Sequence, residues 1–169
     1  NKPPVSENVY YRSLNDFFDF FEKKTNIEVI IGSHPRNLFI NKATWRNRRL
    51  ISGKTPFLVK ESSLVFAHYS TAISFGVLFK KPIIQLTTSE YLESYRNDKF
   101  LAFCKSLNIM QINVNNYDKK KLNSKSLESI DIVAYRNYVE SFLKSNHSPS
   151  GNLWDFIATY INDFSKNKL

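Results

Sequence analysis

The spacing of apolar residues predicts helices and strands that follow one another along the chain. Apolar side chains recur every third or fourth position over residues 14–24, which predicts an amphipathic helix. The short apolar run at residues 28–31 predicts a buried strand, and residues 49–52 predict a second short strand. A helix should follow, with Thr55 as its cap and Pro56 in its first turn.

The central stretch of the chain predicts a strand, a polar turn, a helix and another strand. These elements are residues 64–67, the turn His68-Tyr69-Ser70-Thr71, residues 72–79 and residues 83–86. Ser70 has the residue type of a helix N-cap, and Pro82 ends the helix. A strand, helix and strand within about 25 residues form a βαβ unit, whose two strands run parallel.

The second half of the chain continues the alternation. A helix is expected over residues 98–107, a strand over 109–114, and helical stripes within 135–143 and 153–164. The sequence therefore predicts an α/β fold, a Rossmann-like, doubly wound parallel sheet flanked by helices. We expect residues 1–12 to be a linker or arm and residues 13–169 to form a single domain.

Composition narrows the classes of partner. The chain has 169 residues, with 24 Lys and Arg against 15 Asp and Glu, so its net charge is +9. This charge favours phosphorylated ligands, anionic lipid or nucleic acid. The single cysteine, Cys104, excludes an internal disulfide and lies in an apolar pattern typical of a buried, inert thiol. No apolar run approaches the ~20 residues that span a bilayer, and no signal peptide is visible, so we expect a cytoplasmic protein.

Several kinds of catalytic site have no support in the sequence. The three histidines, at positions 34, 68 and 147, lack the spacing of metal ligands, and His147 fits a surface loop. The chain has neither a Walker loop nor a Gly-x-Gly-x-x-Gly fingerprint, and nothing resembles a nucleophile elbow. We therefore expect no metal and no tightly bound cofactor.

Two polar segments follow predicted strands and indicate a phosphate site. The first is Ser33-His34-Pro35-Arg36, and the second contains Ser70 and Thr71 at a helix start. Ligands of parallel sheets bind at the carboxyl ends of strands, and unpaired N–H groups at a helix start attract anions. A simple helix cap without any ligand also explains the second segment. Further candidates, for contacts with a ribose or base, are Lys54, Thr55, Glu61 and Tyr69.

These segments carry a resemblance to a known family. The stretches are Ile30-Ile-Gly-Ser-His-Pro-Arg36, Leu64-Val-Phe-Ala-His-Tyr-Ser-Thr-Ala72 and Lys81-Pro-Ile-Ile84. They resemble the C-terminal nucleotide-binding half of GT-B glycosyltransferases of bacterial surface polysaccharides, which include sialyltransferase-like, Kdo-transferase-like and glycerophosphotransferase-like enzymes. The resemblance implies that His34 contacts the donor phosphate and that Ser70 and Thr71 bind phosphate.

The resemblance also implies an activity. It is that of a metal-independent, inverting transferase, in which His34 stabilises the departing nucleotide phosphate. The family's acidic base usually lies in the N-terminal half, so this chain alone is expected to bind nucleotide weakly and transfer nothing. The resemblance implies a nucleotide-sugar donor, with CMP or CDP as the suggested nucleotide. The acceptor would be a glycan or a lipid-linked sugar at the inner face of the plasma membrane.

Other activities remain open at this point. They are glycerophosphotransferase-type polymer synthesis, a nucleotide-sugar epimerase, and a non-enzymatic α/β module that binds nucleic acid. An epimerase needs several carboxylates around the sugar, and few are available here. Nucleic acid is the less favoured partner, because aromatic residues alternate with basic ones only at residues 10–12 and 45–49.

Overall fold

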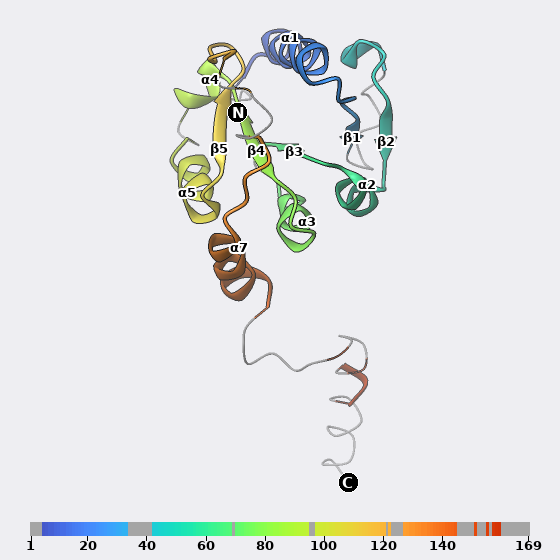
Figure 1. Cartoon of the computed structure of the whole chain (residues 1–169), viewed down its shortest axis with the longest axis vertical. Coiled ribbons are helices and arrows are strands. Elements are labelled where there is room, and N and C mark those ends of the chain that lie inside the picture. Colours follow the sequence, from blue (N-terminus) through green and yellow to red (C-terminus); the bar gives the residue numbers. More distant parts are fainter. Residues whose placement is uncertain are drawn as a thin grey trace.

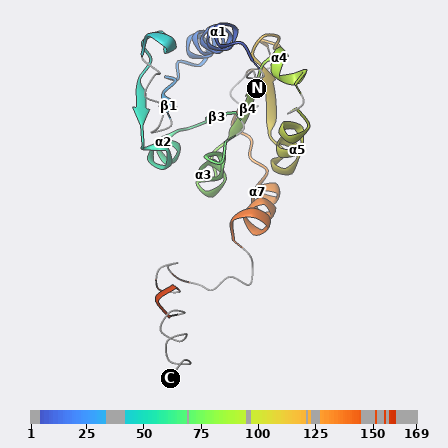
Figure 2. The same ribbon diagram turned by 180° about the vertical axis from the view of Figure 1, so that it is seen from behind.

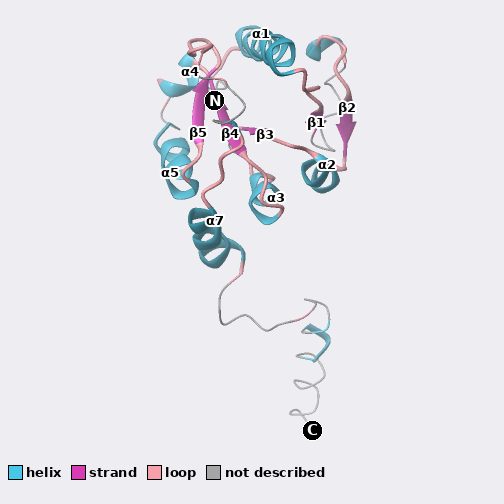
Figure 3. Cartoon of the chain, in the orientation of Figure 1, coloured by secondary structure: helices cyan, strands magenta, loops and turns pink. Residues whose placement is uncertain are grey.

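The computed structural model shows an α/β protein in which helices and parallel strands alternate (Figures 1 and 3). The structure describes residues 5–33, 42–68, 70–94, 97–120, 122, 127–144, 151, 155 and 157–159. Its helices are α1 (Glu7–Thr25), α2 (Thr55–Glu61), α3 (Ile73–Leu78), α4 (Ser89–Leu92), α5 (Asn97–Leu107) and α7 (Ile132–Tyr138), with a 3-10 turn η1 (Ala43–Trp45) and a π-helical turn η2 (Val139–Leu143). Its strands are β1 (Ile31–Ser33), β2 (Leu50–Ser52), β3 (Val65–Ala67), β4 (Ile83–Thr87) and β5 (Met110–Asn113).

The strands form two separate parallel sheets. In the first, β1 pairs with β2, and Gly32 lies opposite Ile51. In the second, β4 lies between β3 and β5, and Phe66 is opposite Ile84. The parallel βαβ unit expected from β3, α3 and β4 is confirmed. The single continuous sheet that a doubly wound fold requires is not what the described residues form.

Helices cover both faces of the three-stranded sheet. One face packs on α1, whose Leu14, Phe17 and Phe21 join Ile84 and Leu86 of β4 in a buried cluster. The opposite face packs on α3, α5 and α7 in a second cluster, to which they contribute Ile73, Val77, Leu107 and Tyr135. The core is therefore divided by the sheet into two layers.

Helix α1 reaches across both sheets. Figures 1 and 2 both show it lying between the β4–β5 side and the β1–β2 side. Its cluster includes Ile31 of β1 and Leu50 of β2 as well as residues of the second sheet. The helix starts at Glu7 instead of near residue 14, so residues 7–12 of the expected linker are helical. Tyr10 and Tyr11 pack against the same cluster, which explains the longer helix.

Several expected element boundaries are wrong by one to three residues. The first strand is Ile31–Ser33 instead of residues 28–31. The N-cap of α2 is Lys54 instead of Thr55, and that of α3 is Ala72 instead of Ser70. The expected and observed boundaries differ because periodicity locates only an apolar run, whereas backbone hydrogen bonds determine where a strand or helix begins and ends.

The later elements match the expectation more closely. The helix expected at 98–107 is α5, and the strand expected at 109–114 contains β5. The apolar stripe expected within residues 135–143 lies in α7 and η2. Most of the last expected stripe, within residues 153–164, lies outside the residues that the structure describes.

Candidate functional site

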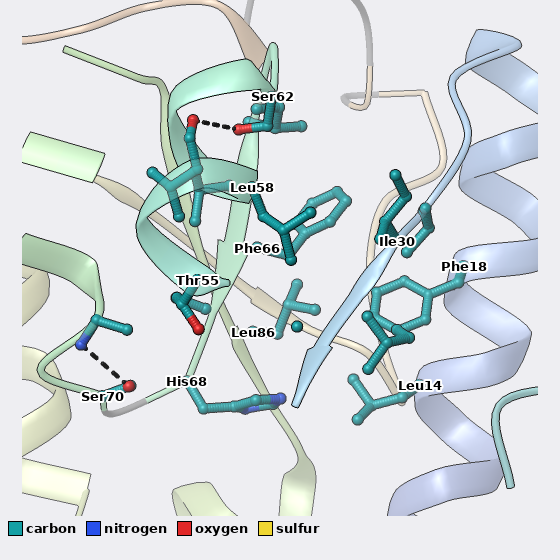
Figure 4. A pocket seen from close by; sticks show the side chains of 18 of the residues that line it. Leu14, Phe18, Ile30, Thr55, Leu58, Ser62, Phe66, His68, Ser70 and Leu86 are labelled. Atoms are coloured by element: carbon teal, nitrogen blue, oxygen red, sulfur yellow. Dashed lines mark hydrogen bonds between the residues drawn. The ribbon is translucent and has the colours of Figure 1, made fainter. Parts of the chain in front are cut away.

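A cavity of about 580 Å³ lies between β1 and β3, in the space that separates the two sheets (Figure 4). Its walls are mostly apolar side chains, among them residues of α1, α2, β3 and β4. Leu14 and Phe18 come from α1, Leu58 from α2, Phe66 from β3 and Leu86 from β4. A cavity of this size with few polar groups has the usual character of a small-molecule site.

The polar groups gather at one end of this cavity. Thr55, His68 and Ser70 all line it, and Figure 4 shows them together at the end opposite Ser62. Thr55 begins the helix after β2, while His68 and Ser70 follow β3. All three therefore lie just beyond the carboxyl ends of parallel strands, where ligands of α/β sheets bind.

His68 is held as a neutral imidazole. Burial lowers its pKa below the usual value, and a hydrogen bond to the backbone of Leu86 acts in the opposite direction without outweighing burial. Its ring lies 5.4 Å from the ring of Tyr10 in α1. Burial also raises the pKa of Tyr10, so its hydroxyl stays protonated. The N–H of the neutral ring donates to Leu86, so His68 offers a ligand its other nitrogen as a hydrogen-bond acceptor, without a permanent charge.

The start of α3 satisfies its own backbone groups. The Ser70 hydroxyl accepts a hydrogen bond from the N–H of Ala72 at 3.2 Å. The next three N–H groups, of residues 73–75, donate to the carbonyls of residues 70–72 at 3.1 Å. These bonds close tight turns, and an anion at this point must compete with them. The groups that remain available to a ligand are the imidazole and the hydroxyls.

The structure brings some of the predicted residues together and separates others. Ser33 ends β1 and is buried, and its neighbour Gly32 lines the same cavity as Ser70. Lys54 and Thr71 flank the polar end of the cavity in sequence but are not among its lining residues. Glu61 closes α2 at the far end, beside Ser62, so it lies away from the polar end.

Four predicted residues cannot be placed. His34, Pro35, Arg36 and Tyr69 lie outside the described residues. The proposed meeting of the imidazole at position 34 with the hydroxyls at 70 and 71 therefore stays a prediction. What the structure adds is that β1, which leads into that segment, ends at the same cavity.

Sequence reasoning missed two residues of the site. The sequence places His68 in the turn at the carboxyl end of a strand, where ligands bind, but only Ser70, Thr71 and Tyr69 of that turn were predicted to contact the ligand. Tyr10 was assigned to a linker. No local pattern links it to His68, since the contact spans 58 residues of chain and exists only because α1 crosses the sheet.

Other candidate chemistry finds little support. Among the described residues no three His, Cys, Asp or Glu side chains gather as a metal site would require. Cys104 is buried and donates a hydrogen bond to Gln85, and burial raises the pKa of its thiol to about 11. The thiol is therefore protonated at neutral pH, as expected for an inert core cysteine.

Comparisons of the chain with protein-family models, with curated proteins and with solved structures found no match to any of them. Within the described part of the chain, no helix combines the length and the apolar character needed to cross a membrane. The function must therefore be argued from the residues and the cavity.

Proposed function

We propose that this chain is the donor-nucleotide-binding domain of a GT-B glycosyltransferase that builds cell-surface glycans. The main support is the polar end of the cavity, where Thr55, His68 and Ser70 converge from two strand ends. The resemblance of the segments around Ser33 and Ser70 supports the same assignment. The Rossmann-like architecture that it implies, with one doubly wound sheet, is part of the proposal.

In the proposed complex the donor phosphate lies at the polar end of the cavity. The hydroxyls of Thr55 and Ser70 donate to its oxygens, and the unprotonated nitrogen of neutral His68, whose N–H donates to Leu86, accepts a hydrogen bond from a hydroxyl of the donor. His34 stabilises the charge that grows on the departing nucleotide phosphate, and Arg36 contributes to the same stabilisation. The acceptor's proton goes to a carboxylate of the other half of the enzyme.

The net charge of +9 fits the proposed surroundings. A basic domain is attracted to the anionic inner face of a plasma membrane, where a lipid-linked acceptor would be presented. The proposal therefore places the chain in the cytoplasm, peripheral to that membrane. It requires neither a metal nor a second cofactor.

Titration calorimetry with CMP, CDP and UMP tests the proposal, with a short single-stranded DNA as the competing ligand. Since a hydrogen bond to a charged group contributes about 1.5–3 kcal/mol, Thr55→Val and Ser70→Ala should each weaken nucleotide binding about 10- to 100-fold. Ser63→Ala is the matched control, because Ser63 lines the far end of the same cavity. His34→Ala should weaken binding without changing the thermal midpoint.

The results that contradict the proposal are specific. Binding of DNA but of no nucleotide would favour the nucleic-acid module instead. If Ser63→Ala and Ser70→Ala weakened nucleotide binding equally, the phosphate would not lie at the polar end of the cavity. A His34→Ala variant that binds as well as the parent would refute the role of that imidazole.

A further inference from the structure

The backbone edges of β1 and β3 that border the cavity are unpaired with one another. The Ile31 N–H donates to the carbonyl of Arg49 at 2.9 Å, so the backbone groups of Ile31 face β2. The Val65 N–H donates at 2.9 Å to the carbonyl just before β4, so its groups face β4. Because successive residues of a strand point their N–H and C=O groups to opposite sides, those of Gly32 and Phe66 point toward the cavity.

The side chains of β1 and β3 alternate between the same two sides, one beneath α1 and the other toward α2 and α3. Ile31 and Phe66 both pack in the cluster beneath α1. Gly32 faces Leu58 of α2 on the opposite side, and Ala67 packs in the cluster beneath α3. Backbone direction and side-chain face therefore agree on the same alternation, which is the condition for two parallel strands to pair.

We propose that β1 and β3 pair directly in a closed form of this protein. The result is one five-stranded parallel sheet with the order β2-β1-β3-β4-β5, in which Gly32 lies opposite Ala67. The apolar part of the cavity then fills with the side chains that now line it, its polar end stays open beyond the strand ends, and the inner backbone groups of both strands gain partners. Figure 4 shows β1 and β3 both running toward His68, as this register needs.

The closed form has a consequence for the candidate site. With Gly32 opposite Ala67, the next pair along the strands is Ser33 and His68. In a sheet of this order the crossovers change direction between β1 and β3, which is where ligands of open α/β sheets bind. Closure therefore adds Ser33 to the polar end and makes the closed sheet the ligand-binding form. This last step rests on the proposed function, whereas the pairing itself does not.

Three cysteine positions test the pairing in the 169-residue chain with Cys104→Ser. The test pair is Gly32→Cys with Ala67→Cys. The positive control is Gly32→Cys with Ile51→Cys, because these positions are register neighbours in the structure. The negative control is Ile51→Cys with Ala67→Cys, which stays two strands apart even in the closed sheet. Each pair is oxidised under mild conditions and disulfide formation is followed over time.

Disulfides need Cα atoms about 4.4–6.8 Å apart, so the test pair should form its disulfide within about tenfold of the positive control's rate and at least about tenfold faster than the negative control. A test pair no faster than the negative control would overturn the proposal. Circular dichroism of the reduced proteins confirms that each variant is folded. If Gly32→Cys links to Val65→Cys faster than to Ala67→Cys, the register and the place of Ser33 are wrong.

The oxidised test pair is then titrated with CMP. The locked protein should bind at least as tightly as its reduced form. Loss of binding on oxidation would contradict closure as the binding form. If neither form binds CMP while the disulfide forms rapidly, the pairing holds and the proposed function fails.

Discussion

Arg48 is a buried guanidinium that joins the chain between the first two strands to α1. Its side chain is 6% exposed and donates to Asn15 at 2.9 Å and to Glu22 at 2.7 Å. It also pairs with Asp19 and lies 5.5 Å from the ring of Phe18. A buried charge is stable only when it is paired, and the pairs of Arg48 with Asp19 and Glu22 tie the segment before β2 to the helix.

Replacing Arg48 with Met should lower the free energy of unfolding by about 2 kcal/mol, because Asp19 and Glu22 lose the charge that holds them at the helix surface. Urea denaturation at neutral pH measures the change. Arg49→Met is the control, since its ion pair with Glu28 is exposed and should contribute no more than about 0.5 kcal/mol. Equal effects of both substitutions would show that burial of Arg48 is unimportant.

The same cluster makes stability depend on pH. Burial acts to raise the pKa of Asp19, but hydrogen bonds and charges from Arg48 and Arg46 outweigh it and hold that pKa below the usual value. A carboxyl with a lowered folded-state pKa stabilises the protein above its unfolded pKa, and this contribution is lost as the pH falls through the folded-state pKa. The loss between about pH 5 and 2 should be smaller in Arg48→Met.

At the scale of elements, α3 lies unusually close to the sheet. A Cβ added to Gly76 would stand 2.8 Å from Cδ1 and 2.9 Å from Cγ1 of the buried Ile83 on β4. Only glycine leaves room for this approach. The close packing sets the position of the Ser70 loop, because that loop connects β3 to this short helix.

Gly76→Ala should therefore destabilise the protein by about 1 kcal/mol, although alanine is the better helix former by a similar amount, since overpacking costs about 1–3 kcal/mol. Thermal unfolding measures the effect. Leu78→Ala, at a position on the same helix that is 52% exposed, should change stability by no more than about 0.5 kcal/mol. A more stable Gly76→Ala protein would show that α3 can move outward freely.

At the scale of the molecule, α1 is the element that holds the two sheets together. Phe17 is fully buried and its ring contacts Phe66 of β3, while Phe18 lies near Trp45 in the segment that leads to β2. The cluster beneath α1 includes residues of both sheets. If α1 separated from either sheet, apolar side chains of the β1–β2 side and of the β3–β5 side would both become exposed.

We therefore expect the two halves to unfold together. In a Trp154→Phe protein, the fluorescence of Trp45 reports on the β1–β2 side, and the reactivity of the buried Cys104 thiol reports on the β3–β5 side. The two denaturation curves should coincide, and Phe17→Ala should lower the free energy of unfolding derived from each curve by about 3–5 kcal/mol. Separate midpoints would show that the halves are independent units.

The sequence alone determined the order and type of most elements. Apolar spacing located α1, α5, the strands and the βαβ unit, because periods of 3.6 and 2 are local properties of the chain. It also identified Ser70, in a turn beyond a strand end, as a phosphate-binding candidate, and Thr55 as a candidate contact for a ribose or base. It did not resolve which residue caps each helix, where β1 begins, or how far α1 extends.

Only the tertiary structure decided how distant segments meet. A cavity lies between β1 and β3, the ring of Tyr10 lies near that of His68, and Arg48 is buried against acidic residues of α1. These arrangements depend on contacts between residues far apart in the chain, and no local period encodes them. Strand pairing is the main contact of this kind. The sequence of a short strand does not specify which other strand it pairs with, and the packing of both sheets against α1 selects the partner.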